Sequence, residues 1–189
     1  MMSKQELRTH MLRERRALPA AEKARLGETI VARLRESPEV QVASVIAGYW
    51  PLLDEVDIRL FLQDCQRQGK IITLPTLPYR DIAFRKINRL SDEMTAVDAP
   101  PFDESSETIP LGAIELAIVP VVAFDDRCNR LGRGSGYYDQ LIATQPYIST
   151  IGVAYELQKV SQIPVESLDQ SLDTIITEST QYILKNNQY

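Results

Sequence analysis

Apolar runs separated by polar segments divide the chain into predicted strands and helices. The longest apolar run, residues 115–124, predicts a buried strand, and residues 42–49, apolar and partly β-branched, predict another. Shorter strands are expected at 70–75, 83–87, 149–155 and 173–177. Helices are expected at 3–17, 20–36, 54–68, 137–144 and 179–187.

The first two predicted helices carry recognisable end signals. Ser3 is expected to cap the first helix, with Glu6 three residues later completing a capping box. Pro19 separates this helix from the next. Lys4 and Arg8 are four residues apart, so they share one helical face and can contact one anion together. The alternative is a solvated basic face.

Strands that alternate with helices predict an α/β fold. We expect a single domain over residues 1–189, with three layers, a largely parallel sheet and helices on both faces. In such sheets, ligands bind at the carboxyl ends of the strands. The Pro-rich, acidic stretch 98–113 is expected to be a long surface loop or lid.

Composition narrows the function classes. The 189 residues include 44% hydrophobic and 25% charged residues, as in soluble globular proteins, and the net charge of −5 gives no reason to expect nucleic acid or a membrane as partner. Cys65 and Cys128 form no metal-ligand spacing. The first residues lack the apolar core of a signal peptide, and no apolar run is long enough for a membrane span, so a cytoplasmic location is expected.

The single histidine limits the chemistry. His10 lies in an Arg-rich predicted helix, where a solvated surface histidine is expected. Metal sites built from several histidines, and Ser-His-Asp catalysis, are excluded unless His10 itself takes part. The chemistry is therefore expected to use carboxylates, Arg, Lys, Tyr, backbone amides or a cofactor.

A glycine-rich loop at 130–139 is the strongest candidate site. Gly132, Gly134 and Gly136 alternate ahead of a predicted helix, where glycine permits positive φ and close approach of a ligand, and the helix N-terminus favours phosphate. Arg130 and Arg133 add charge, and Asp139 lies where a carboxylate can hold Mg²⁺. For the glycines alone, a tight turn at a helix start is an equal alternative.

Two known phosphate-binding patterns do not fit this loop. The lysine of the P-loop pattern is missing. Tyr137 stands where a dinucleotide fingerprint needs its last glycine, and that fingerprint normally follows the first strand. A nicotinamide-dependent enzyme is therefore disfavoured.

The loop and its flanks resemble a known family. The segments 119–125 and 129–139 are similar to the signature of 5-formyltetrahydrofolate cyclo-ligases, also called 5,10-methenyltetrahydrofolate synthetases. Lys4-x-x-x-Arg8 resembles the family's ATP-contacting helix, Asp54-Glu55 its folate-contacting acid, and residues 163–178 its C-terminal pattern. The family's fold is similar to that of sugar-phosphate isomerases and CoA-transferases.

This resemblance implies cyclisation of 5-formyltetrahydrofolate to 5,10-methenyltetrahydrofolate, dependent on ATP and Mg²⁺. ATP phosphorylates the formyl oxygen, and ADP and phosphate are released. Such phosphoryl transfer depends on positioning and charge neutralisation rather than on a protein nucleophile. The expected partners are therefore a reduced folate and ATP, and the protein is expected to be a monomer.

The resemblance also assigns roles by position. The catalytic residues are Arg130, Arg133 and Tyr138. The ATP-binding residues are Lys4, Arg8, Arg130, Leu131, Gly132, Arg133, Gly134, Ser135, Gly136, Tyr137 and Tyr138. The folate-binding residues are Trp50, Glu55, Arg133, Gly134, Ser135, Gly136 and Tyr137, and the Mg²⁺ ligands are Asp139 and Asp169.

Several of these roles have simpler alternatives. Trp50 by itself is expected in core packing, Asp169 in a turn, and Asp54 at a helix start. Either Tyr137 or Tyr138 can face the ligand.

Ser135 departs from the family pattern, because many members have lysine at this position. This serine motivates a second hypothesis, a nucleotide- or phosphometabolite-binding regulatory protein with reduced or lost turnover. A third, an isomerase or CoA-transferase relative, is disfavoured by the basic N-terminal helix and the Tyr-Tyr-Asp sequence.

Overall fold

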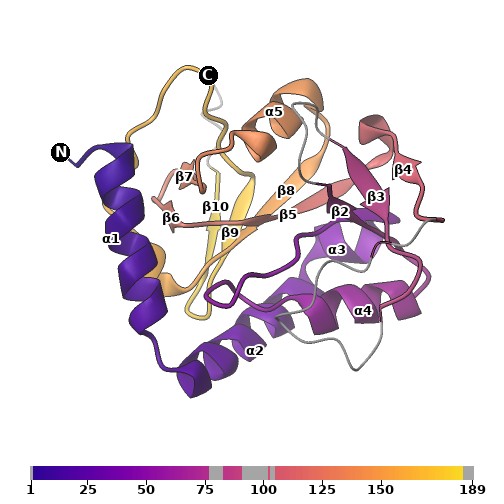
Figure 1. Ribbon diagram of the computed structural model, residues 1–189, viewed down its shortest axis with the longest axis horizontal. Helices are drawn as coiled ribbons and strands as arrows, with labels where there is room; N and C mark the ends of the chain where they lie inside the picture. Colours follow the sequence, from indigo (N-terminus) through magenta and orange to yellow (C-terminus); the bar gives the residue numbers. More distant parts are fainter. Residues whose placement is uncertain (1, 77–82, 91–101, 103–104, 185–189) are drawn as a thin grey trace.

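A mixed, mostly parallel sheet forms the centre of the molecule. The computed structural model describes residues 2–76, 83–90, 102 and 105–184. Within these ranges eight strands pair in the order β10-β9-β8-β5-β1-β2-β3-β4 (Figure 1). The strands are β1 (Val45–Ala47), β2 (Ile71–Pro75), β3 (Phe84–Lys86), β4 (Thr108–Ile109), β5 (Leu116–Pro120), β8 (Ser149–Val153), β9 (Thr174–Ile176) and β10 (Gln181–Ile183).

The five central strands are parallel and the outer strands antiparallel. β9, β8, β5, β1 and β2 pair in parallel, while β3, β4 and β10 join the two sides in antiparallel orientation. Leu116, Ala117, Ile118 and Val119 of β5 are all buried, as expected for a strand covered on both faces. The expected α/β class with a largely parallel sheet is confirmed.

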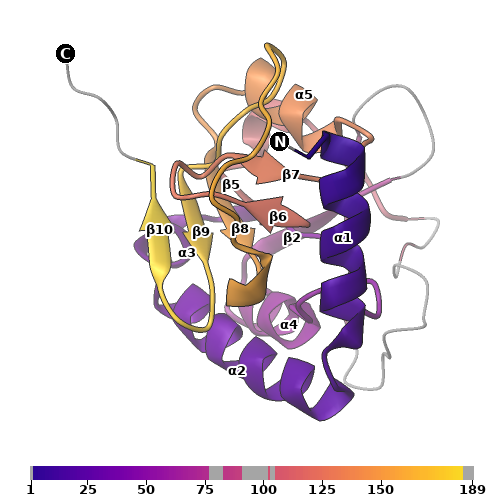
Figure 2. The same cartoon turned by 90° about the vertical axis from the view of Figure 1, so that its left-hand side faces the viewer.

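Helices cover both faces of this sheet. α2 (Ala20–Glu36), α3 (Pro38–Val42) and α4 (Arg59–Arg67) pack on one face, and α5 (Tyr137–Thr144) packs on the other (Figure 1). α1 (Lys4–Ala17) stands across the end of the sheet, beside a small hairpin formed by β6 (Ala123–Phe124) and β7 (Arg130–Leu131) (Figure 2). The predicted helices at 3–17, 20–36 and 137–144 are confirmed.

An apolar stripe on α1 fixes it to the hairpin. Leu7 and Met11 are buried against Val122, Ala123 and Leu131. The predicted capping box is present: the Glu6 amide donates to Ser3 Oγ at 3.3 Å and the Ser3 amide to Glu6 Oε2 at 2.8 Å. Among the helices of the described ranges, none is long and apolar enough to cross a membrane.

Two predicted helices are corrected. The helix expected from residue 54 begins at Arg59, because Asp57 Oδ1 accepts the Arg59 amide and residues 54–56 are buried in a loop instead. The helix expected at 179–187 is wrong over 181–183, which form β10. A turn closed by Thr177 and Thr180 brings this segment back along β9. Residues 185–187 of that prediction lie outside the described residues.

The long strand expected at 115–124 is divided. β5 ends at Pro120 and β6 starts at Ala123, so the glycine loop follows the β6–β7 hairpin rather than β5 itself. Helix α3 was not predicted. Of the loop expected at 98–113, residues 108–109 form β4 and 111–113 a 3₁₀ turn, while 98–101 and 103–104 lie outside the described residues.

Close packing around Gly152 makes the centre of β8 sensitive to one added methyl group. A Cβ at this position would lie 2.6 Å from Leu172 Cδ1 and 3.1 Å from atoms of Ile175 and Val121. We expect Gly152→Ala to lower the free energy of unfolding by about 1–3 kcal/mol, as overpacked cores do, measured by urea denaturation.

Gly27→Ala in α2 is the matched control. A Cβ there has no neighbour within 4 Å among the described residues, and alanine favours the helix by about 0.5–1 kcal/mol. A Gly152→Ala protein as stable as the unchanged protein would contradict the close packing at β8.

Candidate functional site

A cleft of about 370 Å³ opens at the carboxyl end of β5, where ligands of parallel sheets are expected. Five segments form its walls: the start of α1, the loop after β1, the junction of β5 and β6, the glycine loop with the start of α5, and residues 166–169. The lining residues are Lys4, Arg8, Glu55, Pro120, Val122, Arg130, Leu131, Gly132, Arg133, Gly134, Ser135, Gly136, Tyr137, Tyr138, Asp139, Glu166 and Asp169. The structure therefore brings together every predicted site residue except Trp50.

The glycine loop has the backbone that its sequence predicts. Gly134 and Gly136 have φ values of 108° and 67°, in the left-handed region that favours glycine. Gly136 is also the N-cap of α5, so the first amides of that helix begin at Tyr137 beside the cleft. Both features suit close approach of an anion to the backbone.

Arg130 connects the glycine loop to the segment at 166–170. Its Nη1 donates to Asp139 Oδ1 at 2.9 Å and to the Gln170 carbonyl at 2.7 Å, and the Gln170 amide donates to the same Asp139 oxygen at 3.0 Å. Arg130 is buried in β7. Its guanidinium thus holds Asp139 and the 166–170 segment in one arrangement.

Lys4 makes the corresponding contact from α1. Its Nζ lies 2.6 Å from Asp169 Oδ2 and 3.2 Å from Glu166 Oε2. Burial raises the pKa of Asp169, but the hydrogen bonds from Lys4 and from the Glu166 amide outweigh burial, so this pKa lies below 3.8. Burial lowers the pKa of Lys4, but Asp169 and Glu166 outweigh it, so this pKa lies above 10.5. Both groups are charged at neutral pH.

Arg8 lies against the glycine loop itself. Its Nε donates to the Gly132 carbonyl at 2.9 Å, and its guanidinium carbon would lie 3.6 Å from a Cβ at Gly134. The expected common face of Lys4 and Arg8 is therefore present, and both cations line one cleft.

Glu55 and Arg133 form one wall of the cleft, with two partners behind it. Arg133 Nε donates to Glu55 Oε1 at 3.0 Å, and Arg133 Nη2 donates to Asp54 Oδ1 at 3.2 Å. Arg15 donates to the other Asp54 oxygen. Sequence reasoning missed Arg15, although its position seven residues after Arg8 puts it on the same face of α1.

The structure distinguishes the two tyrosines. The Tyr137 hydroxyl donates to the Ala83 carbonyl at 2.7 Å, and its ring packs edge-to-face on Phe84 at 5.7 Å. The Tyr138 hydroxyl is buried and has no hydrogen-bond partner among the described residues. Burial raises the pKa of Tyr137 to about 12 and raises that of Tyr138 further, so both hydroxyls are protonated at neutral pH.

Trp50 has a different setting from the other predicted site residues. Its ring packs against the apolar core that includes residues of α2, α3 and α4, and the Arg59 guanidinium lies 5.9 Å from the ring centre. In the part of the chain that the structure describes, Trp50 does not line the cleft. This position matches the core-packing alternative.

The two predicted metal ligands line the same cleft, and each carboxylate already contacts a cation. Asp139 is paired with Arg130, and Asp169 with Lys4. Among the described residues no group of three or more His, Cys, Asp or Glu could hold a metal ion. Two carboxylates fit the way Mg²⁺ binds beside phosphates, with one or two protein ligands rather than a complete protein cage.

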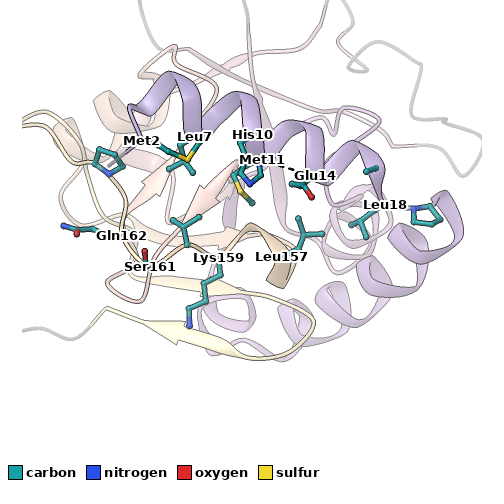
Figure 3. A pocket seen from close by; sticks show the side chains of 14 residues that line it. Met2, Leu7, His10, Met11, Glu14, Leu18, Leu157, Lys159, Ser161 and Gln162 are labelled. Carbon is teal, nitrogen blue, oxygen red and sulfur yellow. Dashed lines mark ion pairs between the residues drawn. The ribbon is translucent and has the colours of Figure 1, made fainter.

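A second hollow, of about 830 Å³, lies between α1 and residues 157–164 (Figure 3). Its walls are mostly apolar, with Leu7, Met11, Leu18 and Leu157 facing the hollow. His10, bonded to Arg13 and near Glu14, stands at its rim, a partly exposed histidine as expected. The glycine loop and the predicted metal ligands are absent from its described lining, so phosphate chemistry points to the smaller cleft.

Comparisons with known proteins agree over most of the chain. A model of the 5-formyltetrahydrofolate cyclo-ligase family matches residues 1–178. The 5-formyltetrahydrofolate cyclo-ligase of Escherichia coli K12 is 29% identical over 178 residues, covering 89% of this chain and 97% of that protein.

Two solved structures have the same fold. The NMR structure of Aquifex aeolicus 5,10-methenyltetrahydrofolate synthetase has a TM-score of 0.83 and 29% identity, covering 100% of this chain and 96% of that one. The Mycoplasma pneumoniae 5,10-methenyltetrahydrofolate synthetase has a TM-score of 0.77 and 27% identity, covering 94% and 99%.

The Lys4–Asp169 pair predicts a pH-dependent part of the stability. Because the folded-state pKa of Asp169 is lowered, its contribution is present above the unfolded pKa near 3.9 and is lost as pH falls through the folded pKa. We expect Asp169→Asn to lower the free energy of unfolding at pH 7 by less than about 1 kcal/mol, because the pair is partly exposed.

Urea denaturation at a series of pH values measures this difference. The two proteins should converge as pH falls through the folded-state pKa of Asp169, where the carboxyl becomes protonated in both states. If the difference in the free energy of unfolding stayed constant down to that pH, the Lys4–Asp169 ion pair would not be its source.

Proposed function

We propose, from the premise that this chain belongs to the 5-formyltetrahydrofolate cyclo-ligase family, that the family's reaction takes place in the 370 Å³ cleft. The activity of the chain is the ATP-dependent ring closure of 5-formyltetrahydrofolate to 5,10-methenyltetrahydrofolate. The observation that supports the location is the meeting of two basic residues of α1, the glycine loop, Glu55 and two aspartates in this single cleft.

The chemistry explains why such a site needs charge more than a nucleophile. A formamide oxygen is a poor leaving group, so the γ-phosphate of ATP is first transferred to it. N10 of the folate then attacks the activated carbon, the C–O bond breaks, and phosphate leaves together with the earlier product ADP. Charge builds up on phosphoryl oxygens in the first step, and positioned cations stabilise it.

The triphosphate is proposed to lie along α1 and the glycine loop. Lys4, Arg8, Arg130 and Arg133 supply four positive charges from three elements, and the backbone of 132–136 supplies close approach without side-chain obstruction. In the structure these cations contact carboxylates or backbone carbonyls. Phosphate oxygens would replace some of those acceptors and keep each charge paired.

The reduced folate is proposed to lie on the Glu55 side. A carboxylate in a buried wall is a suitable acceptor for the amino and ring N–H groups of a pterin. The Tyr138 hydroxyl, buried without a described partner, would gain a hydrogen bond from any polar ligand atom beside it. Trp50 lies outside the described lining of the cleft, so its predicted folate contact is the least supported of the set.

Mg²⁺, when bound, would neutralise charge between the β- and γ-phosphates. Asp139 and Asp169 are the carboxylates proposed to hold it, each exchanging its present cation for the metal. A monomeric state and a cytoplasmic location also belong to this proposal.

The direct test follows the absorbance of the methenyl product with purified protein, 5-formyltetrahydrofolate, ATP and Mg²⁺. We expect Asp139→Asn to lower kcat by about 10²-fold or more, since a group that stabilises developing charge typically contributes that much. The variant should stay folded by circular dichroism, with a lower melting temperature because Arg130 loses its ion pair.

Asp126→Asn is the matched control. Asp126 is exposed, pairs with Lys159 and does not line the described cleft, so this variant should retain full activity. Product formation that does not depend on ATP would refute the proposed site, and normal turnover by Asp139→Asn would refute its metal role. Binding of ATP without turnover would favour the regulatory alternative.

Ser135 offers a second test of where the phosphates lie. The residue is exposed at the tip of the loop, between two glycines of positive φ. We expect Ser135→Lys to lower the KM for ATP about fivefold, because one added charge contact at an exposed position contributes about 1 kcal/mol. Ser135→Met, similar in length but uncharged, should show no such gain, and equal KM values for the two variants would contradict phosphate at this tip.

A further inference from the structure

The carboxylate of Asp54 accepts hydrogen bonds from two arginines, Arg15 and Arg133. Arg15 donates to Oδ2 through Nε at 3.1 Å and through Nη2 at 2.8 Å. Arg133 donates to the opposite oxygen, Oδ1, at 3.2 Å. The Asp54 carboxylate therefore links Arg15 of α1 to Arg133 of the glycine loop.

The Arg15 end of this chain is firmly held. Only 2% of the Arg15 side chain is exposed, and its Nη1 donates to the Val121 carbonyl at 3.0 Å. Val121 lies at the junction of β5 and β6, and Gln158 donates to the same carbonyl at 2.5 Å. A buried guanidinium with its donors engaged in this way has little rotational freedom, so Asp54 is fixed with it.

The Arg133 end is different, because this residue stands between two glycines and its side chain is 37% exposed. Its planar fork is divided between two carboxylates, with Nε on Glu55 Oε1 at 3.0 Å and Nη2 on Asp54. Two acceptors fix the plane of a guanidinium more strictly than one. The side chain of this glycine-flanked residue is thus oriented by carboxylates that lie outside the loop.

Further charged groups around Asp54 extend this ion-pair network. Arg15 Nη2 also lies 3.9 Å from Glu55 Oε1, and Arg16 Nε lies 3.8 Å from Asp54 Oδ2. Burial raises the pKa of Asp54, but the hydrogen bonds and charge of Arg15 and the charge of Arg133 outweigh it, and this pKa lies below 3.8. Asp54 is therefore ionised at neutral pH.

We propose that Arg15 and Asp54 are positioning residues that orient the Arg133 guanidinium at the cleft. Neither belongs to the described cleft lining, so neither is a catalytic residue. The proposal rests on the proposed function, in which Arg133 contacts the reacting groups. If it holds, disturbing Arg15 lowers kcat through Arg133, and any change in KM for ATP or folate also depends on the Arg133 side chain.

A double-mutant cycle between Arg15→Lys and Arg133→Lys tests this transmission. Each change keeps the charge and removes the planar fork. We expect Arg15→Lys alone to lower kcat about tenfold. In the Arg133→Lys background the same change should lower kcat by less than about twofold, because the Arg133 guanidinium that Arg15 orients is already absent. Equal losses in both backgrounds would overturn the proposal and leave Arg15 a purely structural residue.

Stability and control measurements separate the outcomes. All four proteins are assayed below their melting temperatures, and Arg15→Gln replaces Arg15→Lys in the same cycle if the lysine variant is not folded. Asp64→Asn on α4, which loses ion pairs with Arg35 of α2 and Arg67 of α4, is the control for the loss of a surface network and should retain normal kcat. If the protein without substitutions is active and the losses in kcat of the two variants are additive, only this inference is refuted. If the protein without substitutions is inactive, the proposed function is refuted, and this inference with it.

Discussion

The docking of α1 across the end of the sheet is the interaction on which the cleft depends. Leu7 and Met11 pack on the β6–β7 hairpin, and the cations at positions 4, 8 and 15 occupy the adjoining face of the same helix. Apolar packing and charge placement are therefore coupled in one rigid element. Each cation contacts a different segment: Lys4 the loop at 166–169, Arg8 the glycine loop, and Arg15 the loop after β1. One helix thereby contacts all three walls, which Arg130 and Arg133 also join to one another.

The second constraint on the cleft is that each of its cations needs a hydrogen-bond acceptor or an opposite charge. A buried or half-buried guanidinium without a partner is strongly destabilising, so in the described structure the cations of this site contact carboxylates or carbonyls. A triphosphate offers acceptors of the same kind and the same sign. Binding can then exchange one set of charge-assisted hydrogen bonds for another, which avoids exposing a bare charge. Asp139 and Asp169 are neutralised in the same way, because each carboxylate contacts a cation.

The parts predicted well from the sequence are those decided by local chemistry. The Ser3–Glu6 capping box, the start of α5 after Gly136 and the buried parallel strands depend on short-range patterns. The failures have long-range causes. Residues 181–183 form a strand because β9 is available as a pairing partner, and residues 54–56 leave the helix because Arg15 and Arg133 engage Asp54. Likewise, only the contact with the Ala83 backbone shows that Tyr137 is anchored, while the Tyr138 hydroxyl is buried without a partner among the described residues.

The glycine loop shows how a fold can restrict one position and leave its neighbour open. Gly134 combines positive φ with the Arg8 guanidinium 3.6 Å from a would-be Cβ, so a side chain there would strain the backbone and crowd a cation. Ser135, the next residue, is exposed. Its side chain can therefore change in charge and length at little cost to folding. In the proposed site, the loop thus separates the backbone geometry that a phosphate would approach from the side-chain charge that would hold it. Serine at this position leaves the backbone geometry as it is and adds no charge.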